Sequence, residues 1–198
     1  MHLKTKTITV FLIAALLVAG LAGCGGNKEP ENPQQVVLNL YAPTSSVLVV
    51  SNIVDRFTEA NETIGIKITY DDGAVLASKI EAGYDCDIYI SDHTEYMDWL
   101  DVTFANSSSN PNRHDRIDPD TRADVFKGTV EVENTDPPQY DENDELIEPE
   151  PKYEDLTFTA AMVKKTAYPD QVKEFLAYMQ DKDSVGQLFE GIDFEMID

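Results

Sequence analysis

Apolar and polar residues follow two alternating periods between residues 36 and 104. Short apolar runs rich in β-branched residues have the length of buried strands, and each leads into a stretch whose apolar residues recur at helical spacing. The predicted strands are 36–41, 65–70 and 86–91, and the predicted helices are 45–60, 74–82 and 93–100. Because strand and helix alternate, the pattern predicts a right-handed parallel α/β unit.

The alternation returns near the C-terminus. Residues 156–163 are predicted to form a strand beside 86–91, and Pro169 is placed to start a helix as its first residue. A last short helix is expected at about 184–190, ending near Gly191. The predicted inner faces are Val47, Val50, Ile53, Val54 and Phe57 in the first helix, Val75, Leu76 and Ile80 in the second, and Val172, Phe175, Leu176 and Met179 in the C-terminal one.

Residues 105–152 differ in composition from both flanking regions. They are rich in Asn, Ser, Pro, Asp and Glu, and only 125–126 and 130–132 have the character of a short strand. Such a segment lacks the apolar content to bury a core of its own, so we expect an acidic, Pro-rich irregular insert. Its acidic run at 141–150 lacks the spaced Asp-x-Asp-x-Asp-Gly loop of a Ca²⁺ site, which favours a solvated stretch.

The N-terminus has the features of a targeting segment. Lys4 and Lys6 precede an apolar run that is too short for a comfortable membrane span. The run ends Leu-Ala-Gly-Cys, which resembles the lipobox of bacterial lipoproteins, in which the cysteine carries the lipid. We therefore expect a lipoprotein signal peptide at 1–23, lipidation of Cys24 and a tether at 24–35, giving an extracytoplasmic, membrane-anchored protein. An ordinary secretory signal is the alternative.

Composition narrows the possible partners. The chain has 37 acidic residues against 15 Lys and Arg, a net charge of −22, which argues against binding nucleic acid or anionic lipid surfaces. No Gly-x-Ser-x-Gly, P-loop, His-Glu-x-x-His or Cys-x-x-Cys sequence is present, so we expect no enzyme activity, no cofactor and no metal site. After processing at Cys24, Cys86 is the remaining cysteine. It sits between two acidic residues at the start of an apolar run, which predicts a buried small residue.

Candidate ligand-binding residues follow the first two predicted strands. Thr44 and Ser45 come after the first strand, and Gly73 and Ala74 come after the second. In an open parallel sheet, ligands bind outside the carboxyl ends of the strands, where the first N–H groups of the helices favour an oxyanion. Three alternatives are open: Ser45 as a plain helix cap, Gly73 as a turn glycine with positive φ, and Asp71 and Asp72 as either cation ligands or a solvated turn.

Several of these segments together resemble a known family. The order Tyr-Ala-Pro-Thr-Ser (41–45), Leu-Ala-x-x-Ile-Glu-Ala-Gly (76–83), Asp-Ile-Tyr-Ile-Ser (87–91) and Tyr-Met-Asp-Trp-Leu (96–100) is similar to the molybdate/tungstate-binding subfamily of periplasmic substrate-binding proteins. The resemblance implies a three-layer α/β lobe of the periplasmic-binding-protein type II class, with a mostly parallel sheet. It makes 36–104 plus 153–198 lobe I, with the insert at 105–152 in place of a largely missing lobe II.

The resemblance also implies where an oxyanion binds, and where this chain departs from the family. The hydroxyl after the first strand corresponds to Ser45, but the second hydroxyl position is occupied by Gly73, and Asp72 adds a carboxylate beside it. The donors of the second lobe have no match, since neither Tyr140 nor Tyr153 can be placed in register.

Three hypotheses follow. The first is a lipid-anchored substrate-binding protein of an ABC importer that binds a small oxyanion, molybdate or tungstate, and works with an ABC permease. The second is a degenerate substrate-binding-like lipoprotein that acts as an interaction module without a transport ligand. The third is an acidic surface protein that binds divalent cations.

Overall fold

The computed structural model describes residues 36–101, 115–132, 134, 136–143, 145–147 and 150–197. The predicted signal peptide, the tether and Cys24 lie outside the described residues. None of the described helices is long and apolar enough to cross a membrane.

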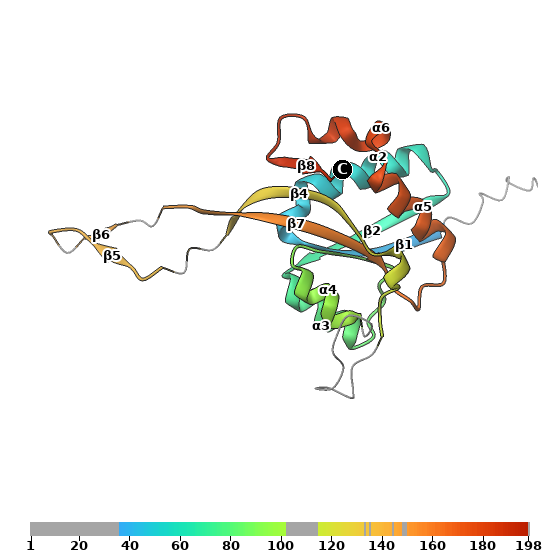
Figure 1. The fold of residues 1–198 in the computed structure, drawn as a ribbon, viewed down its shortest axis with the longest axis horizontal. Helices are drawn as coiled ribbons and strands as arrows, with labels where there is room; N and C mark the ends of the chain where they lie inside the picture. The colour runs from blue at the N-terminus through green and yellow to red at the C-terminus, as the bar shows by residue number, and fades with distance from the viewer. Residues whose placement is uncertain are drawn as a thin grey trace, which may run out of the picture. The chain divides into compact units, whose positions relative to one another are not determined.

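Within the described residues, six strands form the central sheet, in the order β2-β1-β3-β7-β4-β8 (Figure 1). The strands are β1 Val36–Pro43, β2 Ile64–Asp71, β3 Ile88–Ser91, β4 Ala123–Val132, β7 Lys152–Met162 and β8 Phe194–Met196. The α-helices are α2 Val47–Ala60, α3 Gly73–Glu81, α4 Thr94–Leu100, α5 Pro169–Gln180 and α6 Lys182–Val185, and the 3₁₀ turns are η1 Thr44–Ser46, η2 Pro119–Thr121 and η3 Gly186–Phe189. A separate pair, β5 Gln139–Tyr140 and β6 Leu146–Ile147, is antiparallel.

The sheet is mixed rather than mostly parallel. β1 pairs in parallel with β2 and with β3, whereas the β3–β7, β7–β4 and β4–β8 pairs are antiparallel. The expected place of the C-terminal strand beside 86–91 is confirmed by the β3–β7 pair, in which Tyr89 lies opposite Ala161. Since β7 and β4 continue the sheet with antiparallel pairs, parallel order is confined to β2, β1 and β3.

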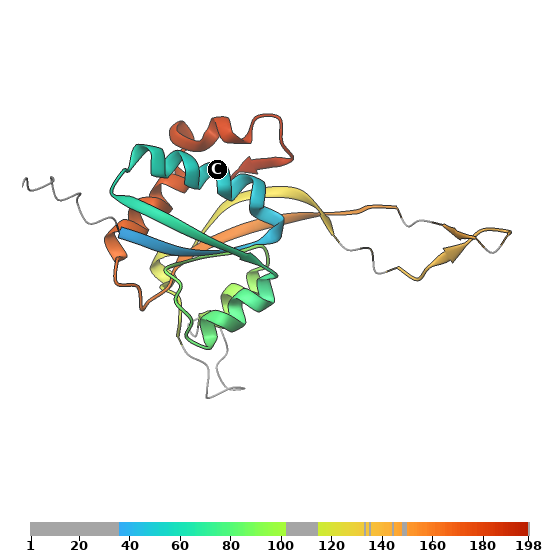
Figure 2. The same cartoon turned by 180° about the vertical axis from the view of Figure 1, so that it is seen from behind.

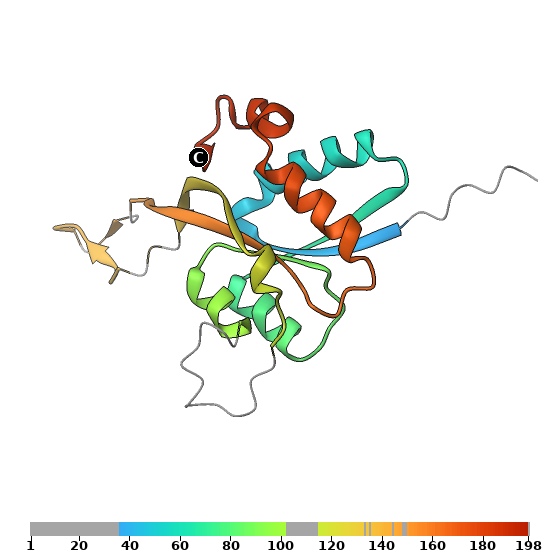
Figure 3. The ribbon, with the colours of Figure 1, turned by 45° about the vertical axis from the view of Figure 1, so that its right-hand side comes forward.

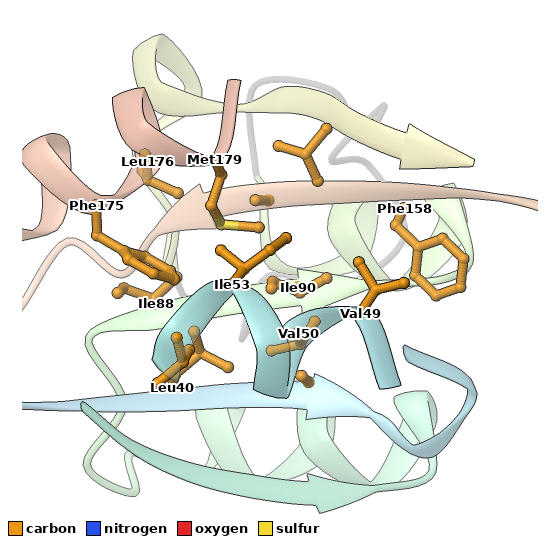
Figure 4. Packing of buried hydrophobic residues seen from close by; sticks show 14 of the residues in the cluster. Leu40, Val49, Val50, Ile53, Ile88, Ile90, Phe158, Phe175, Leu176 and Met179 are labelled. Carbon is orange, nitrogen blue, oxygen red and sulfur yellow. The ribbon is translucent and has the colours of Figure 1, made fainter. Parts of the chain in front are cut away.

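Helices cover both faces of the sheet, which confirms the three-layer α/β expectation (Figure 3). Side chains alternate across each strand: Leu40 of β1 faces the core beneath α2 and α5, while Tyr41 faces the core beneath α3 and α4. Figure 4 shows the first core, where Ile53 of α2 lies near Ile88, Ile90 and Met179. Burial on both faces explains why the strand sequences are so uniformly apolar.

Most predicted helix faces are correct, with two exceptions at helix starts. Val47 is 39% exposed and Val75 is 41% exposed, so neither belongs to an inner face. Val49 takes the buried place expected for Val47. The α5 face is confirmed in full, with Pro169 at the start of the helix. Cys86 is also buried as expected, and that burial raises the pKa of its thiol.

The predicted insert is wrong in one important part. Residues 123–132 form the ten-residue strand β4, which lies beside β7 and pairs with it along its length (Figure 2). The strand carries the buried side chains of Val125 and Phe126. The Phe126 ring stacks on Phe158 at a centroid distance of 4.7 Å. β4 is therefore part of the central sheet, and β7 begins at Lys152 rather than at 156.

Candidate functional site

The carboxyl ends of β1, β2 and β3 lie at one edge of the sheet because the three strands are parallel. Ser45 follows β1 within η1, Gly73 opens α3 after β2, and Asp92 follows β3 directly. The strand-end positions predicted from the sequence are therefore brought together, and a third position, Asp92, joins them.

Asp92 accepts the hydrogen bond of the Ser45 hydroxyl. The Ser45 Oγ to Asp92 Oδ2 distance is 2.7 Å, and the Asp92 side chain is only 12% exposed. Ser45 does not cap α2: Ser46 precedes that helix and makes no side-chain cap hydrogen bond to it. Ser45 thus lies at the strand end, and its hydroxyl is already paired with a carboxylate. Thr44 is exposed at the start of η1.

Asp72 occupies the N–H groups that an oxyanion would use at the start of α3. Its Oδ1 accepts from the backbone N–H of Ala74 at 2.8 Å and of Val75 at 3.3 Å, which makes Asp72 the N-cap of the helix. A carboxylate has the same negative charge and acceptor oxygens as an oxyanion, so it satisfies the same helix-end donors.

Gly73 is required by close packing rather than by a positive φ. Among the described glycines, positive φ occurs at Gly83 and Gly191, so the turn-glycine alternative for Gly73 is wrong. A Cβ at position 73 would lie 2.8 Å from Asp92 Oδ1 and 3.0 Å from the ring of Tyr96. The side chains at positions 73 and 92 are therefore sterically coupled, because a serine at 73 would collide with the Asp92 carboxylate.

Buried hydroxyls tie these loops to each other. The Tyr89 hydroxyl donates to the Gly73 carbonyl at 3.2 Å, and Ser91 Oγ donates to the His93 carbonyl at 2.8 Å. Burial raises the pKa of Tyr89, and burial together with the charges of Asp72, Glu95 and Asp92 raises the pKa of Tyr96. The Tyr96 ring lies over Gly73, beside the Asp92 carboxylate.

A shallow hollow of about 430 Å³ opens beside Ser45. It is bordered by Leu48 at the start of α2, by Thr129–Glu131 of β4 and by Gly191–Phe194 near the C-terminus. Ser45 thus borders open space, whereas Gly73 is buried under Asp92 and Tyr96.

The cation alternative for the acidic pair gains no geometric support. Asp71 pairs with Lys79 at 2.7 Å, and Asp72 is used as the helix cap. Within the described ranges, no group of three or more His, Cys, Asp or Glu side chains is arranged to hold a metal ion.

Asp92 and Tyr96 are the site residues that the sequence interpretation missed. The rule that placed Ser45 and Gly73, a polar or small residue directly after a parallel strand, applies equally to the third strand. Applied there, it selects Asp92. Tyr96 carries no such signal, because its place over Gly73 depends on how α4 packs against α3.

Part of the chain is similar in sequence to molybdate-binding proteins. The chain is 28% identical over 92 residues to the molybdate-binding protein ModA of Mycobacterium tuberculosis and of Mycobacterium bovis. That match covers 44% of this chain and 35% of the mycobacterial proteins, so the chain spans about a third of the length of these relatives. The resemblance to molybdate-binding proteins is confirmed. No known family profile matches the chain.

Solved structures agree on the fold. A substrate-binding domain assigned to a molybdenum ABC transporter of Clostridium difficile superposes with a TM-score of 0.61 at 15% identity, covering 83% of this chain and all of that one. The periplasmic molybdate-binding protein of Azotobacter vinelandii superposes with a TM-score of 0.56 at 10% identity, covering 76% of this chain and 96% of that one. The fold is that of a periplasmic-binding-protein-like α/β lobe.

Proposed function

We propose that this protein is an extracytoplasmic substrate-binding protein of an ABC importer that binds a small oxyanion of the molybdate or tungstate type. The observation that carries the proposal is that Ser45, Gly73 and Ala74 follow parallel strands whose carboxyl ends lie at one edge of the sheet. The partial sequence match to molybdate-binding proteins and the shared fold support it.

In this proposal the oxyanion takes the place of two carboxylates. The Ser45 hydroxyl would leave Asp92, and the Ala74 N–H would leave Asp72, so that both donate to the bound anion. Each displaced carboxylate remains nearby and repels the ligand. With a single lobe, water also keeps access to the donors. We therefore expect micromolar affinity at best, corresponding to about −8 kcal/mol or weaker.

Isothermal titration of the purified chain with molybdate, tungstate and sulfate tests this function. A hydrogen bond to a charged group contributes about 1.5–3 kcal/mol, so Ser45→Ala should weaken molybdate binding by roughly tenfold to a hundredfold. Ser51→Ala is the matched control, because the Ser51 hydroxyl donates to the Val47 carbonyl within α2. Binding that is equally tight in both variants would place the ligand elsewhere.

The second candidate is an interaction module without a transported ligand. It is favoured by the same two carboxylates, which satisfy the site donors from within the chain. Absence of heat with all three anions in the wild-type chain, combined with absence of binding in Asp72→Ser, would decide for this candidate.

The proposed location depends on Cys24. We propose that Cys24 carries a lipid that anchors the protein outside the cytoplasm, as the lipobox-like Leu-Ala-Gly-Cys sequence predicts. Cys24→Ala should release the protein from the membrane fraction and leave a longer, unprocessed N-terminus. A variant that stays with membranes in high salt would contradict the anchor.

A further inference from the structure

A two-stranded ribbon continues from the edge that carries the candidate site. β4 runs in the direction of β3, since both are antiparallel to β7. Ser91 lies opposite Thr159, but β7 extends back to Lys152, which pairs with Val132. At about 3.3 Å per residue, the β4–β7 pair passes the end of β3 by roughly 20 Å.

The described residues within 129–155 are called the ribbon. They lie beyond the point where β8 pairs with β4. Four of its large apolar side chains are exposed: Tyr140 by 57%, Leu146 by 59%, Ile147 by 46% and Tyr153 by 61%. Tyr140 and Leu146 lie directly opposite each other in the β5–β6 pair. Pro137, Pro138, Leu146 and Ile147 border a groove of about 570 Å³, together with Asn134, Asp136, Gln139 and Glu150.

This apolar surface is set among negative charges. The described part of the ribbon from Asn134 onward has seven exposed acidic side chains and a single lysine, and Lys152 is paired with Asp136 at 2.8 Å. The seven acids are Asp136, Asp141, Glu142, Glu145, Glu150, Glu154 and Asp155. A two-stranded ribbon without a covering layer is at best marginally stable in water, so its apolar side chains gain from being covered.

We propose that the ribbon is a docking surface for a protein whose contacting face is basic around an apolar centre. Such a partner would cover Leu146 and Ile147 while its Lys or Arg side chains pair with the surrounding acids. A second copy of this chain would set like charges against each other. An anionic lipid surface would do the same.

Binding of the full chain to mitochondrial cytochrome c tests the surface. In this probe, lysines surround an exposed apolar haem edge, and the same protein with succinylated lysines is the negative control. At about 50 mM salt we expect measurable binding, strongly weakened at about 500 mM because surface charges are then screened. Leu146→Ser combined with Ile147→Ser, and Glu142→Gln combined with Glu145→Gln, should each weaken binding by about fivefold or more.

Matched changes outside the ribbon separate docking from general charge attraction. Val75→Ser replaces an exposed apolar residue of α3, and Glu59→Gln with Glu62→Gln removes two exposed acids near the end of α2. These controls should change the affinity by less than about twofold. Equal weakening by ribbon and control variants would overturn the proposal, as would unchanged binding of the ribbon variants. Self-association that Leu146→Ser with Ile147→Ser abolishes would assign the surface to a second copy instead.

Discussion

The parallel half and the antiparallel half of the sheet differ in what they place at the edge that carries the candidate site. In the parallel half, β2, β1 and β3 end at one edge. The residues that follow these strands, Gly73, Ser45 and Asp92, lie together there. In the antiparallel half, β7 and β4 continue past that edge as a ribbon with exposed apolar and acidic side chains. Parallel order gathers polar groups at one point, whereas antiparallel order lets a strand pair extend into solvent.

Removing a large side chain from the antiparallel half should have the largest effect on stability. Phe158→Ala deletes a fully buried ring that stacks on Phe126, which should lower the free energy of unfolding by about 3–5 kcal/mol. Tyr153→Ala, in the exposed part of the same strand, should change it by less than about 0.5 kcal/mol. Urea unfolding followed by circular dichroism measures both. Similar losses of stability in the two variants would show that the ribbon is packed as tightly as the hydrophobic core.

Gly73→Ser should test the close contact at the strand ends. A Cβ at 73 lies 2.8 Å from Asp92 Oδ1, so the added side chain forces a rearrangement that should cost about 1–3 kcal/mol of stability. Adding Asp92→Ala removes the colliding carboxylate. The double variant should therefore recover most of the loss in a double-mutant cycle. Strictly additive effects would mean that positions 73 and 92 are independent.

Asp72 should stabilise α3 while it opposes an anion. Asp72→Ala removes the cap of Ala74 and Val75 and should cost about 1 kcal/mol, whereas Asp72→Ser keeps a capping oxygen and should cost less than half of that. Melting temperatures of the two variants measure the difference. Asp72→Ala melting at the wild-type temperature would show that the cap contributes nothing.

The smallest effect is expected from the Asp71–Lys79 pair, and it depends on pH. The Lys79 hydrogen bond lowers the pKa of Asp71, so the ionised form of Asp71 is more favourable in the folded state than in the unfolded state. The stabilisation is therefore present at neutral pH and is lost as the pH falls through the lowered pKa. Asp71→Asn should melt slightly below wild type at pH 7, and the gap should close in acid. A gap that widens in acid would contradict this sign.

The sequence predicted the parallel half well because its strands are buried on both faces. Continuous apolar runs such as 36–41 leave a clear signal, and the residues after them, Ser45 and Gly73, are at the predicted edge. β4 was underestimated because its outward positions, among them Lys127 and Glu131, dilute the apolar pattern and its order depends on distant partners in β7.

The chemistry at the edge was harder to predict than its position. Ser45 and Ala74 were expected to present free donors, but a hydrogen-bond partner is a property of tertiary structure. Asp92 reaches Ser45 from 47 residues away in the sequence, and Asp72 bends onto the helix that it precedes. Local pattern identified the donors; only the packed structure identified the carboxylates that occupy them.

The most direct test is a molybdate titration of wild type beside the double variant Asp72→Ser with Asp92→Ala. The central claim is that two internal carboxylates hold the donors of an oxyanion site. Freeing the Ser45 hydroxyl and removing two like charges should tighten molybdate binding by at least about tenfold, or 1.4 kcal/mol. Wild type binding molybdate as tightly as the double variant, or more tightly, would contradict the claim.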